Sequence, residues 1–184
     1  MGVNIWQNEA VRLRAVEPED WKIFMDWNLD TETARMCYFI PFPQSAVDVQ
    51  RFALETSQKR GENDHYVWMI ENPDGIAVGN LNSNDTDRRI GTFSYGVAIR
   101  REFWGKGYAP QAIRLVLNYF FNELGYQKCN VGVYSFNSAS IRLHEKLGFV
   151  REGQRRRTIY TAGQYFDDVL FGMTIEEYRA RWPS

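Results

Sequence analysis

Gly105 and Gly107 stand two residues apart, between an apolar run and a helix-like pattern. The first amides of a helix lack intrahelical partners, and the helix dipole places partial positive charge beside them. Glycines at such a turn let an anion approach the backbone closely. The segment lacks the Gly-Lys-Ser/Thr ending of an ATP-binding P-loop and the third glycine of a dinucleotide-binding turn. We therefore predict a turn that binds a pyrophosphate-bearing ligand other than ATP or NAD; a strand-to-helix turn of purely structural purpose is the alternative.

The residues after these glycines predict one amphipathic helix. Apolar positions recur at the three- and four-residue spacing of a single helix face. They are Ala109, Ala112, Ile113, Val116, Leu117, Phe120 and Leu124. Gly125 then suits the position at which helices end. A strand before the glycines and this helix after them are the elements that must position the anion site.

Two motifs carry a family resemblance. The run Trp104–Ala109 (Trp-Gly-Lys-Gly-Tyr-Ala) resembles the acetyl-CoA pyrophosphate loop of the GCN5-related N-acetyltransferase (GNAT) superfamily, usually written Gln/Arg-x-x-Gly-x-Gly/Ala. Trp104 stands where this pattern has Gln or Arg. The run with tryptophan at this position resembles the form seen in the branch of ribosomal-protein N-terminal acetyltransferases. The run Asn137–Phe149 resembles the Asn-x-x-Ser…Glu-Lys-x-Gly-Phe segment of the family. The resemblance extends from about Val11 to about Thr174.

The resemblance implies acetyl-CoA as cosubstrate and indicates which residues contact it. Loop amides would bind the pyrophosphate, the preceding strand would bind the pantetheine arm, and two side chains of the second motif would reach the cofactor. The implied contacts are Val97, Ile99, Trp104, Gly105, Lys106, Gly107, Tyr108, Ala109, Asn137 and Ser140. Helix capping is the alternative role for Asn137.

His144 occupies the position at which many family members carry a tyrosine that acts as general acid. Asn137, Ser140 and His144 are spaced i, i+3 and i+7, so they share one face of the predicted helix. An imidazole could protonate the departing thiolate, whose reference pKa is about 8.5. We therefore predict His144 as a catalytic residue, with Ser140 or Tyr134 as substitutes; a structural histidine is the alternative.

A general base is less evident. Ser94 stands where family members often carry Glu in the strand before the loop. A peptide α-amine has a reference pKa of about 7.7–8.0, against about 10.4 for lysine, so it needs less help to lose its proton. This favours N-terminal or other weakly basic amines over polyamines. The Glu-rich acceptor segment of a spermidine enzyme is also absent near residues 38–44.

Further residues bear on the acceptor. By resemblance the segment Tyr38–Phe42 could form an aromatic wall of the acceptor site; an ordinary packed loop is the alternative. Glu102, Asp167 and Asp168 are candidate acceptor contacts, although exposed acids are the simpler interpretation. Four arginines could touch the CoA 3′-phosphate or an acidic partner, although a solvated strand face is favoured. They are Arg151, Arg155, Arg156 and Arg157.

Length and composition limit the remaining possibilities. The 184 residues predict one domain over 1–184 with a substantial core. A net charge of −1 offers no general attraction to nucleic acid or to an anionic membrane. We expect neither as a partner, and a homodimer remains open. There is no signal-peptide core and no apolar run of about eighteen residues, so we expect a cytoplasmic protein. Cys37 and Cys129 lack metal-ligand spacing, so we expect two buried free thiols and no metal site.

The hydropathy pattern predicts an α/β protein. Strands are expected over 11–15, 66–70, 76–81, 90–99, 128–135, 155–159 and 165–173. Helices are expected from residue 17 and over 45–59, 109–124, 137–147 and 174–182, and a polar turn over 82–89. In the helix over 45–59 we expect Val47, Phe52 and Ala53 or Leu54 to face inward. With the resemblance, these elements imply the GNAT fold: a mixed, mostly antiparallel sheet with a splayed parallel strand pair, flanked by helices.

The sequence thus predicts an N-acetyltransferase that transfers the acetyl group of acetyl-CoA to a primary amine by direct attack in a ternary complex. The amine would be a peptide or protein N-terminus or a small molecule. A catalytically weak acyl-CoA-binding sensor is the alternative, because Trp104, Ser94 and His144 depart from the family pattern.

Overall fold

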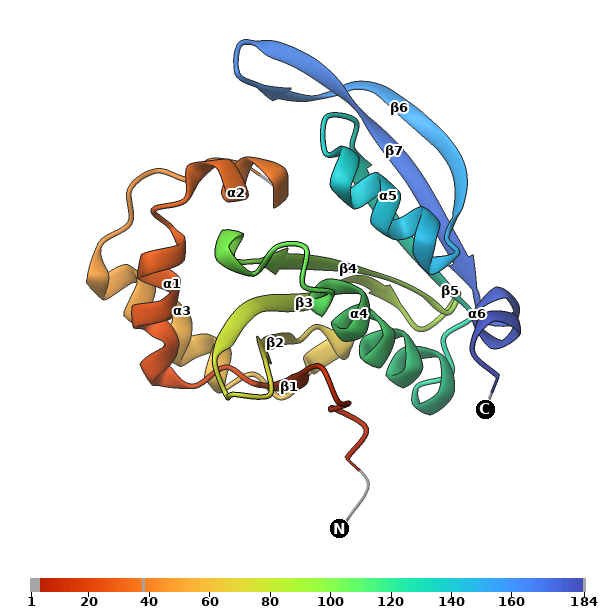
Figure 1. Ribbon diagram of the computed structural model, residues 1–184, viewed down its shortest axis with the longest axis horizontal. Helices are drawn as coiled ribbons and strands as arrows, with labels where there is room; N and C mark the ends of the chain where they lie inside the picture. Colours follow the sequence, from red (N-terminus) through yellow and green to blue (C-terminus); the bar gives the residue numbers. More distant parts are fainter. Residues whose placement is uncertain (1–3, 38, 184) are drawn as a thin grey trace. The chain divides into compact units, whose positions relative to one another are not determined.

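The computed structural model describes residues 4–37 and 39–183 (Figure 1). They form two compact units: the described parts of 1–84 with 96–116, and of 85–95 with 117–184. Seven strands in the described part form one sheet in the order β1-β2-β3-β4-β5-β7-β6, and helices flank it. This is the predicted α/β GNAT fold. Strand β4 (Thr92–Ile99) contributes residues to both units.

The first unit holds the antiparallel strands β1 (Arg12–Ala15) and β2 (Val67–Glu71) and most of β3 (Ala77–Asp87), whose residues 85–87 belong to the second unit. The strands predicted over 66–70 and 76–81 are confirmed, and they form an antiparallel hairpin. The polar turn predicted over 82–89 is wrong, because β3 continues to Asp87 and the chain turns only at 88–91. Polar Asn82 and Asn84 are half-buried on one side of β3, while Leu81 and Ser83 are buried on the other. The alternation of a strand therefore outweighs local polarity.

Three α-helices join β1 to β2: α1 (Trp21–Trp27), α2 (Thr31–Cys37) and α3 (Ala46–Ser57). A 3₁₀ turn over Pro18–Asp20 begins the first, and another over Glu62–Asp64 follows the third. The helix α2 is absent from the sequence prediction. It has no buried residue, so its pattern carries no core stripe.

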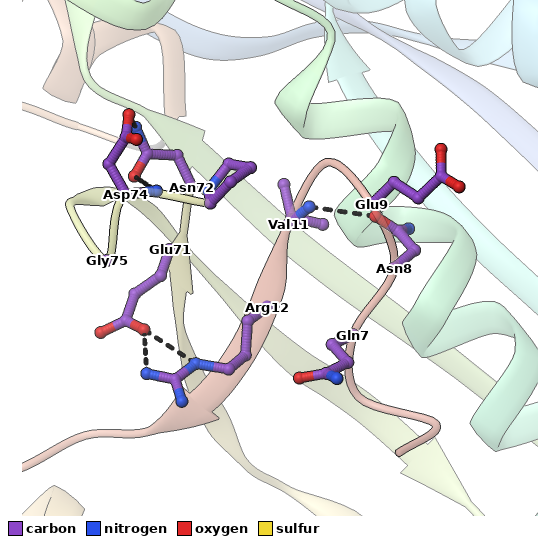
Figure 2. A pocket seen from close by; sticks show the side chains of 10 residues that line it. Gln7, Asn8, Glu9, Val11, Arg12, Glu71, Asn72, Asp74 and Gly75 are labelled. Carbon is purple, nitrogen blue, oxygen red and sulfur yellow. Dashed lines mark hydrogen bonds and ion pairs between the residues drawn. The ribbon is translucent and has the colours of Figure 1, made fainter. Parts of the chain in front are cut away.

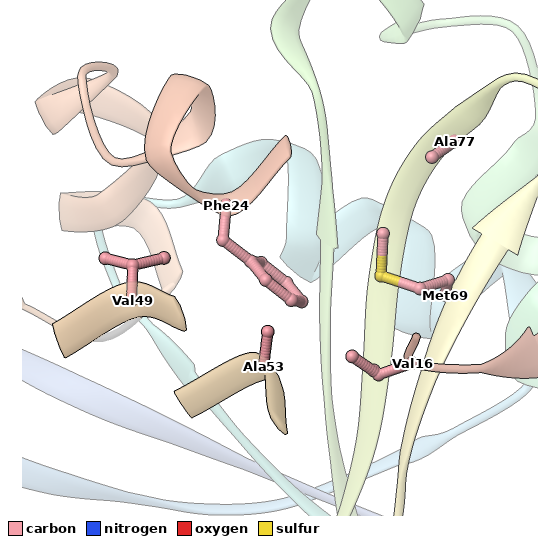
Figure 3. Close-up of a cluster of buried hydrophobic side chains, with 6 residues drawn as sticks. All are labelled: Val16, Phe24, Val49, Ala53, Met69 and Ala77. Atoms are coloured by element: carbon pink, nitrogen blue, oxygen red, sulfur yellow. The ribbon is translucent and has the colours of Figure 1, made fainter. Parts of the chain in front are cut away.

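The helix α3 begins where predicted, but its buried face differs from the expected one. Ser45 caps it by accepting a hydrogen bond from the Asp48 amide. Its buried residues are Val49, Ala53 and Thr56, whereas Val47, Phe52 and Leu54 are exposed. Residues spaced i, i+4 and i+7 share one face, and this face packs with Phe24, Met69 and Val16 in the core of the first unit (Figure 3). The inward positions predicted for Val47, Phe52 and Leu54 are therefore wrong, and that for Ala53 is confirmed.

The helix α4 (Tyr108–Asn118) carries the predicted apolar face. Ala112, Ile113 and Val116 are fully buried. The helix continues as a π-helical turn over Tyr119–Glu123 and ends before Gly125, whose φ is 74°.

The second unit contains β5 (Lys128–Tyr134), α5 (Ser138–Leu147), β6 (Val150–Thr161), β7 (Gln164–Thr174) and α6 (Ile175–Arg181). The strands β6 and β7 form a long antiparallel hairpin (Figure 1). The parallel register of β4 with β5 covers only Thr92↔Lys128 and Phe93↔Cys129. The predicted parallel pair is thus confirmed, and it is joined only at its beginning. Phe93 stacks on Phe120 with ring centroids 4.2 Å apart in the core of this unit.

Cys129 is buried, as expected, but Cys37 at the end of α2 is exposed, so the prediction of a buried thiol there is wrong. No helix in the described part of the chain is long and apolar enough to cross a membrane.

An ion-pair network fixes β1 to its neighbours. Arg14 contacts both oxygens of Asp20, at 2.7 and 2.9 Å, and its Nε donates to Glu71 at 2.5 Å. Arg12 also contacts Glu71. Burial raises the pKa of Glu71, but hydrogen bonds from Arg14 and Arg12 outweigh burial and lower it. Both carboxylates are buried, so they depend on Arg14 for compensation.

We expect Arg14→Ala to lower the free energy of unfolding by about 3 kcal/mol, because it leaves two buried carboxylates short of a partner. The matched control is Arg51→Ala, which removes an exposed arginine that lies 3.9 Å from Asp48 within α3. That change should cost less than about 0.5 kcal/mol. Urea denaturation of both variants measures the difference, and equal losses would contradict a special role for Arg14.

Candidate functional site

The predicted anion-binding loop lies in the first unit, between β4 and α4. After Ile99 a 3₁₀ turn over Arg101–Phe103 leads into Trp104, and α4 begins at Tyr108. Gly105 and Gly107 have φ values of 75° and 82°, in the left-handed region that glycine adopts without strain. The two glycines thus make the last turn of the chain before α4 begins at Tyr108.

The backbone amides of this loop are available to a ligand. Among the described residues, no amide from Gly105 to Ala109 donates a hydrogen bond to any acceptor outside the helix. A Cβ atom added at Gly105 or Gly107 would meet nothing within 4 Å, so the space above both residues is open. Unpaired amides at the N-terminus of α4 attract an anion because the helix dipole adds to their partial charges.

The end of β4, which leads into the loop, packs closely against β3. The Arg100 amide donates to the Val78 carbonyl oxygen at 2.8 Å. A Cβ at Gly79 would lie 2.2 Å from the carbonyl oxygen of Ala98, so only glycine fits there. The indole Nε1 of Trp104 donates to the carbonyl oxygen of Ile99 at 2.7 Å. Val97 and Ile99 are half-exposed on this fixed strand end.

The second unit holds the other predicted site residues. Asn137 precedes α5 and accepts a hydrogen bond from the Ser140 amide at 3.1 Å, so the capping role is confirmed. Its own amide donates to the Tyr134 carbonyl oxygen at 2.8 Å, which brings the end of β5 beside the start of α5. Tyr134, Asn137 and Ser140 are all half-buried.

His144 lies in the core of this unit, with only 2% of its surface exposed. Its ring packs against Tyr95, Phe149 and Phe171, at centroid distances of 5.9, 5.2 and 5.7 Å. Nδ1 is 2.8 Å from the Ser140 carbonyl oxygen, which can only accept, so Nδ1 carries a proton. Burial lowers the pKa of His144, and the Ser140 bond offsets this only in part. The imidazole is therefore neutral at pH 7, with an unprotonated Nε2.

The charged candidates are mostly paired. Glu102 lies 2.7 Å from Arg100. Asp168 is not exposed, contrary to the simpler interpretation: it is buried and pairs with Arg155. Asp167 is held by the Gln154 side chain and by the Arg157 amide, and these contacts lower its pKa. Arg156 is exposed, and Arg157 lies 4.8 Å from the Tyr165 ring centroid, which fits the predicted solvated strand face.

The proposed acceptor segment is only partly described. Tyr38 lies outside the described residues. Phe39, Ile40 and Phe42 are 58%, 40% and 92% exposed, so they are not an ordinary packed loop. Ser94 is half-buried on β4. The described residues contain no cluster of three or more His, Cys, Asp or Glu that could hold a metal ion.

A pocket of about 500 Å³ lies elsewhere in the first unit, beside β1 and the β2–β3 turn (Figure 2). Its polar groups already serve one another. Glu71 contacts Arg12, and Asn72 Oδ1 accepts from the amides of Asp74 and Ile76. It contains none of the predicted site residues and no nucleophile, so its groups stabilise the turn.

The structure thus brings the predicted residues together in two sets. Val97, Ile99 and the loop Trp104–Ala109 lie together in the first unit, and Tyr134, Asn137, Ser140 and His144 in the second. Sequence reasoning missed Arg100 and Arg101, which leave β4 and pair with Asp26 and Asp30 on the α1–α2 segment. Their partners lie more than 70 residues away along the chain, at no spacing that a sequence motif could reveal.

Comparison with known proteins is consistent with this arrangement. Residues 10–150 match the family model described as an acetyltransferase (GNAT) domain. The chain is 44% identical over 178 residues to the SPbeta prophage-derived uncharacterized N-acetyltransferase YokL of Bacillus subtilis (strain 168), covering 97% of each chain. It is 27% identical to the spermidine N(1)-acetyltransferase of Escherichia coli (strain K12), over 93% of this chain and 89% of that one. The fold resembles spermidine N-acetyltransferase from Vibrio cholerae in complex with CoA and spermine, with a TM-score of 0.81, 22% identity, and coverage of 93% and 99%.

The buried histidine predicts a specific pH dependence of stability. In the unfolded chain the imidazole has its ordinary pKa of 6.5, and in the folded chain the pKa is lower. Stability is therefore complete above about pH 6.5 and falls below it, by at most about 1.4 kcal/mol per pH unit, as the unfolded state takes up a proton. Urea denaturation between pH 5.5 and 7.5 should show this slope, and His144→Leu should flatten it.

His65, the other histidine, is exposed, so His65→Gln is the matched control and should keep the slope. Because Nε2 is buried and unprotonated, His144→Leu should also leave acetyl-transfer turnover at pH 8 within about twofold of the unmodified protein. A much larger fall in turnover would restore His144 as the proton donor.

Proposed function

The chain belongs to the acetyltransferase (GNAT) family and uses acetyl-CoA, and we propose that it acetylates a primary amine by direct attack in a ternary complex. The single observation that carries the proposal is the row of unpaired loop amides at the start of α4, beneath open space at Gly105 and Gly107. Two linked phosphates fit such a row because each offers several anionic oxygens to adjacent N–H donors.

The remaining cofactor contacts follow from the ends of the elements. We assign the pantetheine arm to backbone groups around Val97 and Ile99, whose strand end is fixed by β3 and by Trp104. Asn137 and Ser140 are assigned contacts with the cofactor by family resemblance, with the side-chain Oδ1 of Asn137 already accepting the bond that caps α5.

The proposed reaction exchanges a C–S bond for a C–N bond. The neutral amine nitrogen attacks the thioester carbonyl carbon, the C–N bond forms, the C–S bond breaks, and the amine loses one proton while the thiolate gains one. Ser140 and Tyr134 are our candidates for the proton donor, because both are half-buried whereas His144 is enclosed and neutral. A tyrosine with a reference pKa of about 10 is the closer match to a thiol of about 8.5.

The charges near the acceptor segment favour a weakly basic amine. Each acid of the segment from α1 to α2 lies beside an arginine: Asp26 with Arg100, Asp30 with Arg101, and Glu32 with Arg35 at 3.7 Å. A polycation gains little from carboxylates that are already neutralised. The exposed Phe39, Ile40 and Phe42 offer apolar contact instead. We therefore propose a peptide or protein N-terminus, as in ribosomal-protein N-terminal acetyltransferases.

One observation favours a second function. Ser94 replaces the glutamate that many family members carry as general base. A chain that binds acyl-CoA but accelerates transfer weakly would act as a sensor of the cofactor.

Gly107→Val tests the cofactor loop. A branched residue at φ 82° is strained, and its side chain would occupy the open space where we place the pyrophosphate. We expect the CoA dissociation constant, measured by isothermal titration calorimetry, to rise more than about tenfold through loss of amide–phosphate bonds. The far-ultraviolet circular dichroism spectrum should be retained. Gly75→Val is the matched control, because Gly75 has a φ of 75° and lies in the open β2–β3 turn, outside the loop Trp104–Ala109. Unchanged CoA affinity in Gly107→Val would contradict the assignment.

Thiol release from acetyl-CoA with a panel of amines tests the acceptor. At pH 7.5 roughly a third of peptide α-amines are neutral, against about one in a thousand amines of pKa 10.4. We expect kcat/KM for a lysine-free peptide to exceed that for spermidine at least about tenfold. The same peptide with a blocked N-terminus should be inert. Preference for spermidine would overturn the N-terminal assignment, and tight CoA binding without turnover on any amine would favour the sensor.

A further inference from the structure

Arg101 is the second residue after β4, and it reaches the segment that joins α1 to α2. Its Nε and one terminal nitrogen contact the two carboxylate oxygens of Asp30, at 3.0 and 2.6 Å. This is the two-pronged geometry in which an arginine–carboxylate pair is strongest and most directional. The hydrogen bonds from Arg101 hold the pKa of Asp30 well below its usual range, so the pair stays ionised in all working buffers.

Asp30 is itself fixed in place. It precedes α2, and its two oxygens accept bonds from the Thr33 amide, at 3.1 Å, and from the Thr33 hydroxyl, at 2.7 Å. These bonds cap the N-terminus of α2. The partner of Arg101 is therefore an anchored carboxylate of the acceptor-side segment.

On its other side Arg101 contacts the cofactor loop. Its guanidinium carbon lies 5.2 Å from the Trp104 ring centroid, within the range of a cation–π contact. The indole of Trp104 then donates to the carbonyl oxygen of Ile99 at 2.7 Å. Trp104 is 46% exposed, so burial does not hold the ring, and these two contacts set its orientation.

We infer that Asp30, Arg101 and Trp104 form a positioning chain that ties the α1–α2 segment to the end of β4, so that the start of α2, the helix before the proposed acceptor residues 39–42, is held at a fixed distance from the cofactor strand. The inference rests on the proposed function, since it assigns the two ends of the chain to the two substrates. None of the three residues performs chemistry. Their effect is to hold the Ile99 peptide, and with it the pantetheine contacts, at a fixed distance from the acceptor segment.

The neighbouring arginine repeats the arrangement, which supports a purpose for both. Arg100 pairs with Asp26 on α1 at 2.9 Å, and its guanidinium lies 6.0 Å from the Trp27 ring and 5.9 Å from the Phe103 ring. A single exposed ion pair contributes little. Here two adjacent arginines each join a carboxylate to an aromatic ring. Both therefore restrict the α1–α2 segment relative to the end of β4, in a geometry that the planar guanidinium defines.

The positioning chain gives a physical reason for the tryptophan at position 104 of the loop. Trp104 stands where the family pattern has Gln or Arg. Here the indole supplies both a flat face for Arg101 and a donor for Ile99. Phenylalanine would keep the face and lose the donor, which makes Trp104→Phe a selective probe.

A double-mutant cycle tests the chain. Asp30→Asn removes the charge that holds Arg101 but keeps the cap of α2, because asparagine caps helices as well as aspartate does. Trp104→Phe removes the donor to Ile99. The two variants, their combination and the unmodified protein are compared by CoA dissociation constant, by KM for the peptide acceptor and by urea denaturation. Arg51→Gln, which breaks the exposed Asp48 pair within α3, is the matched control.

We expect each single change to weaken CoA binding about fivefold. The double change should also weaken it about fivefold, because either substitution alone already interrupts the linkage from Asp30 through Arg101 and Trp104 to Ile99. KM for the acceptor should rise in parallel, and Arg51→Gln should alter neither quantity. An additive loss of about twenty-five-fold, or unchanged CoA affinity in Asp30→Asn, would overturn the inference.

A failure of the proposed function can be distinguished from a failure of the positioning chain. If the unmodified protein bound no CoA, the acetyltransferase assignment would fall, and the cycle would still be read from the unfolding free energies. Non-additive losses of stability would support the chain as a tie between the two segments, and additive losses would overturn it.

Discussion

The unpaired amides between β4 and α4 are the constraint around which the first unit is arranged. Backbone N–H groups without acceptors are costly when buried, so they must face solvent or a ligand. Left-handed φ values at Gly105 and Gly107 turn these groups outward, and the space above the glycines stays open. The close approach of β3 at Gly79 holds the strand that feeds this turn. The cofactor site that we propose here is thus built from backbone groups, and side chains serve mainly to keep that backbone in place.

Arginine contributes to this site by holding the elements that surround it. Arg14 compensates the two buried carboxylates of Asp20 and Glu71, and Arg100 and Arg101 connect the end of β4 to the α1–α2 segment. The planar guanidinium suits this purpose, because one face stacks on an aromatic ring while the edge binds a carboxylate. The same pairing removes free negative charge from the acceptor side. In the function that we propose, the same ion pairs would therefore hold the site and disfavour a polycationic amine.

The position of His144 shows how burial decides protonation, and protonation decides what chemistry is open to a residue. A histidine in a solvated cleft would titrate near neutral pH and could give a proton to a thiolate. Enclosed by Tyr95, Phe149 and Phe171, the ring keeps the neutral form. Its Nδ1–H bond to Ser140 joins successive turns of α5, which suits packing better than proton transfer. The half-buried Ser140 and Tyr134 lie closer to solvent on the same elements.

Local rules were enough to predict most elements and the glycine turn before α4 from the sequence. The glycine spacing, the apolar face of α4 and the cap at Asn137 all depend on residues within a few positions of one another. The β2–β3 hairpin follows from turn chemistry in the same way. Failures occur where the determining partner is remote. The pattern of α2 carries no core stripe, β3 extends because its far half alternates between two environments, and the buried face of α3 follows from its packing on Phe24 and Met69.

By itself, then, the sequence determined the fold family and the glycine turn before α4, because a glycine turn followed by a helix N-terminus is a local arrangement of backbone groups. Only the tertiary structure decided the surroundings of His144, Asp30, Arg101 and Trp104. Burial of an imidazole and pairing of an arginine with a carboxylate 71 residues away depend on which elements pack together. That information resides in the three-dimensional contacts and in no spacing along the chain.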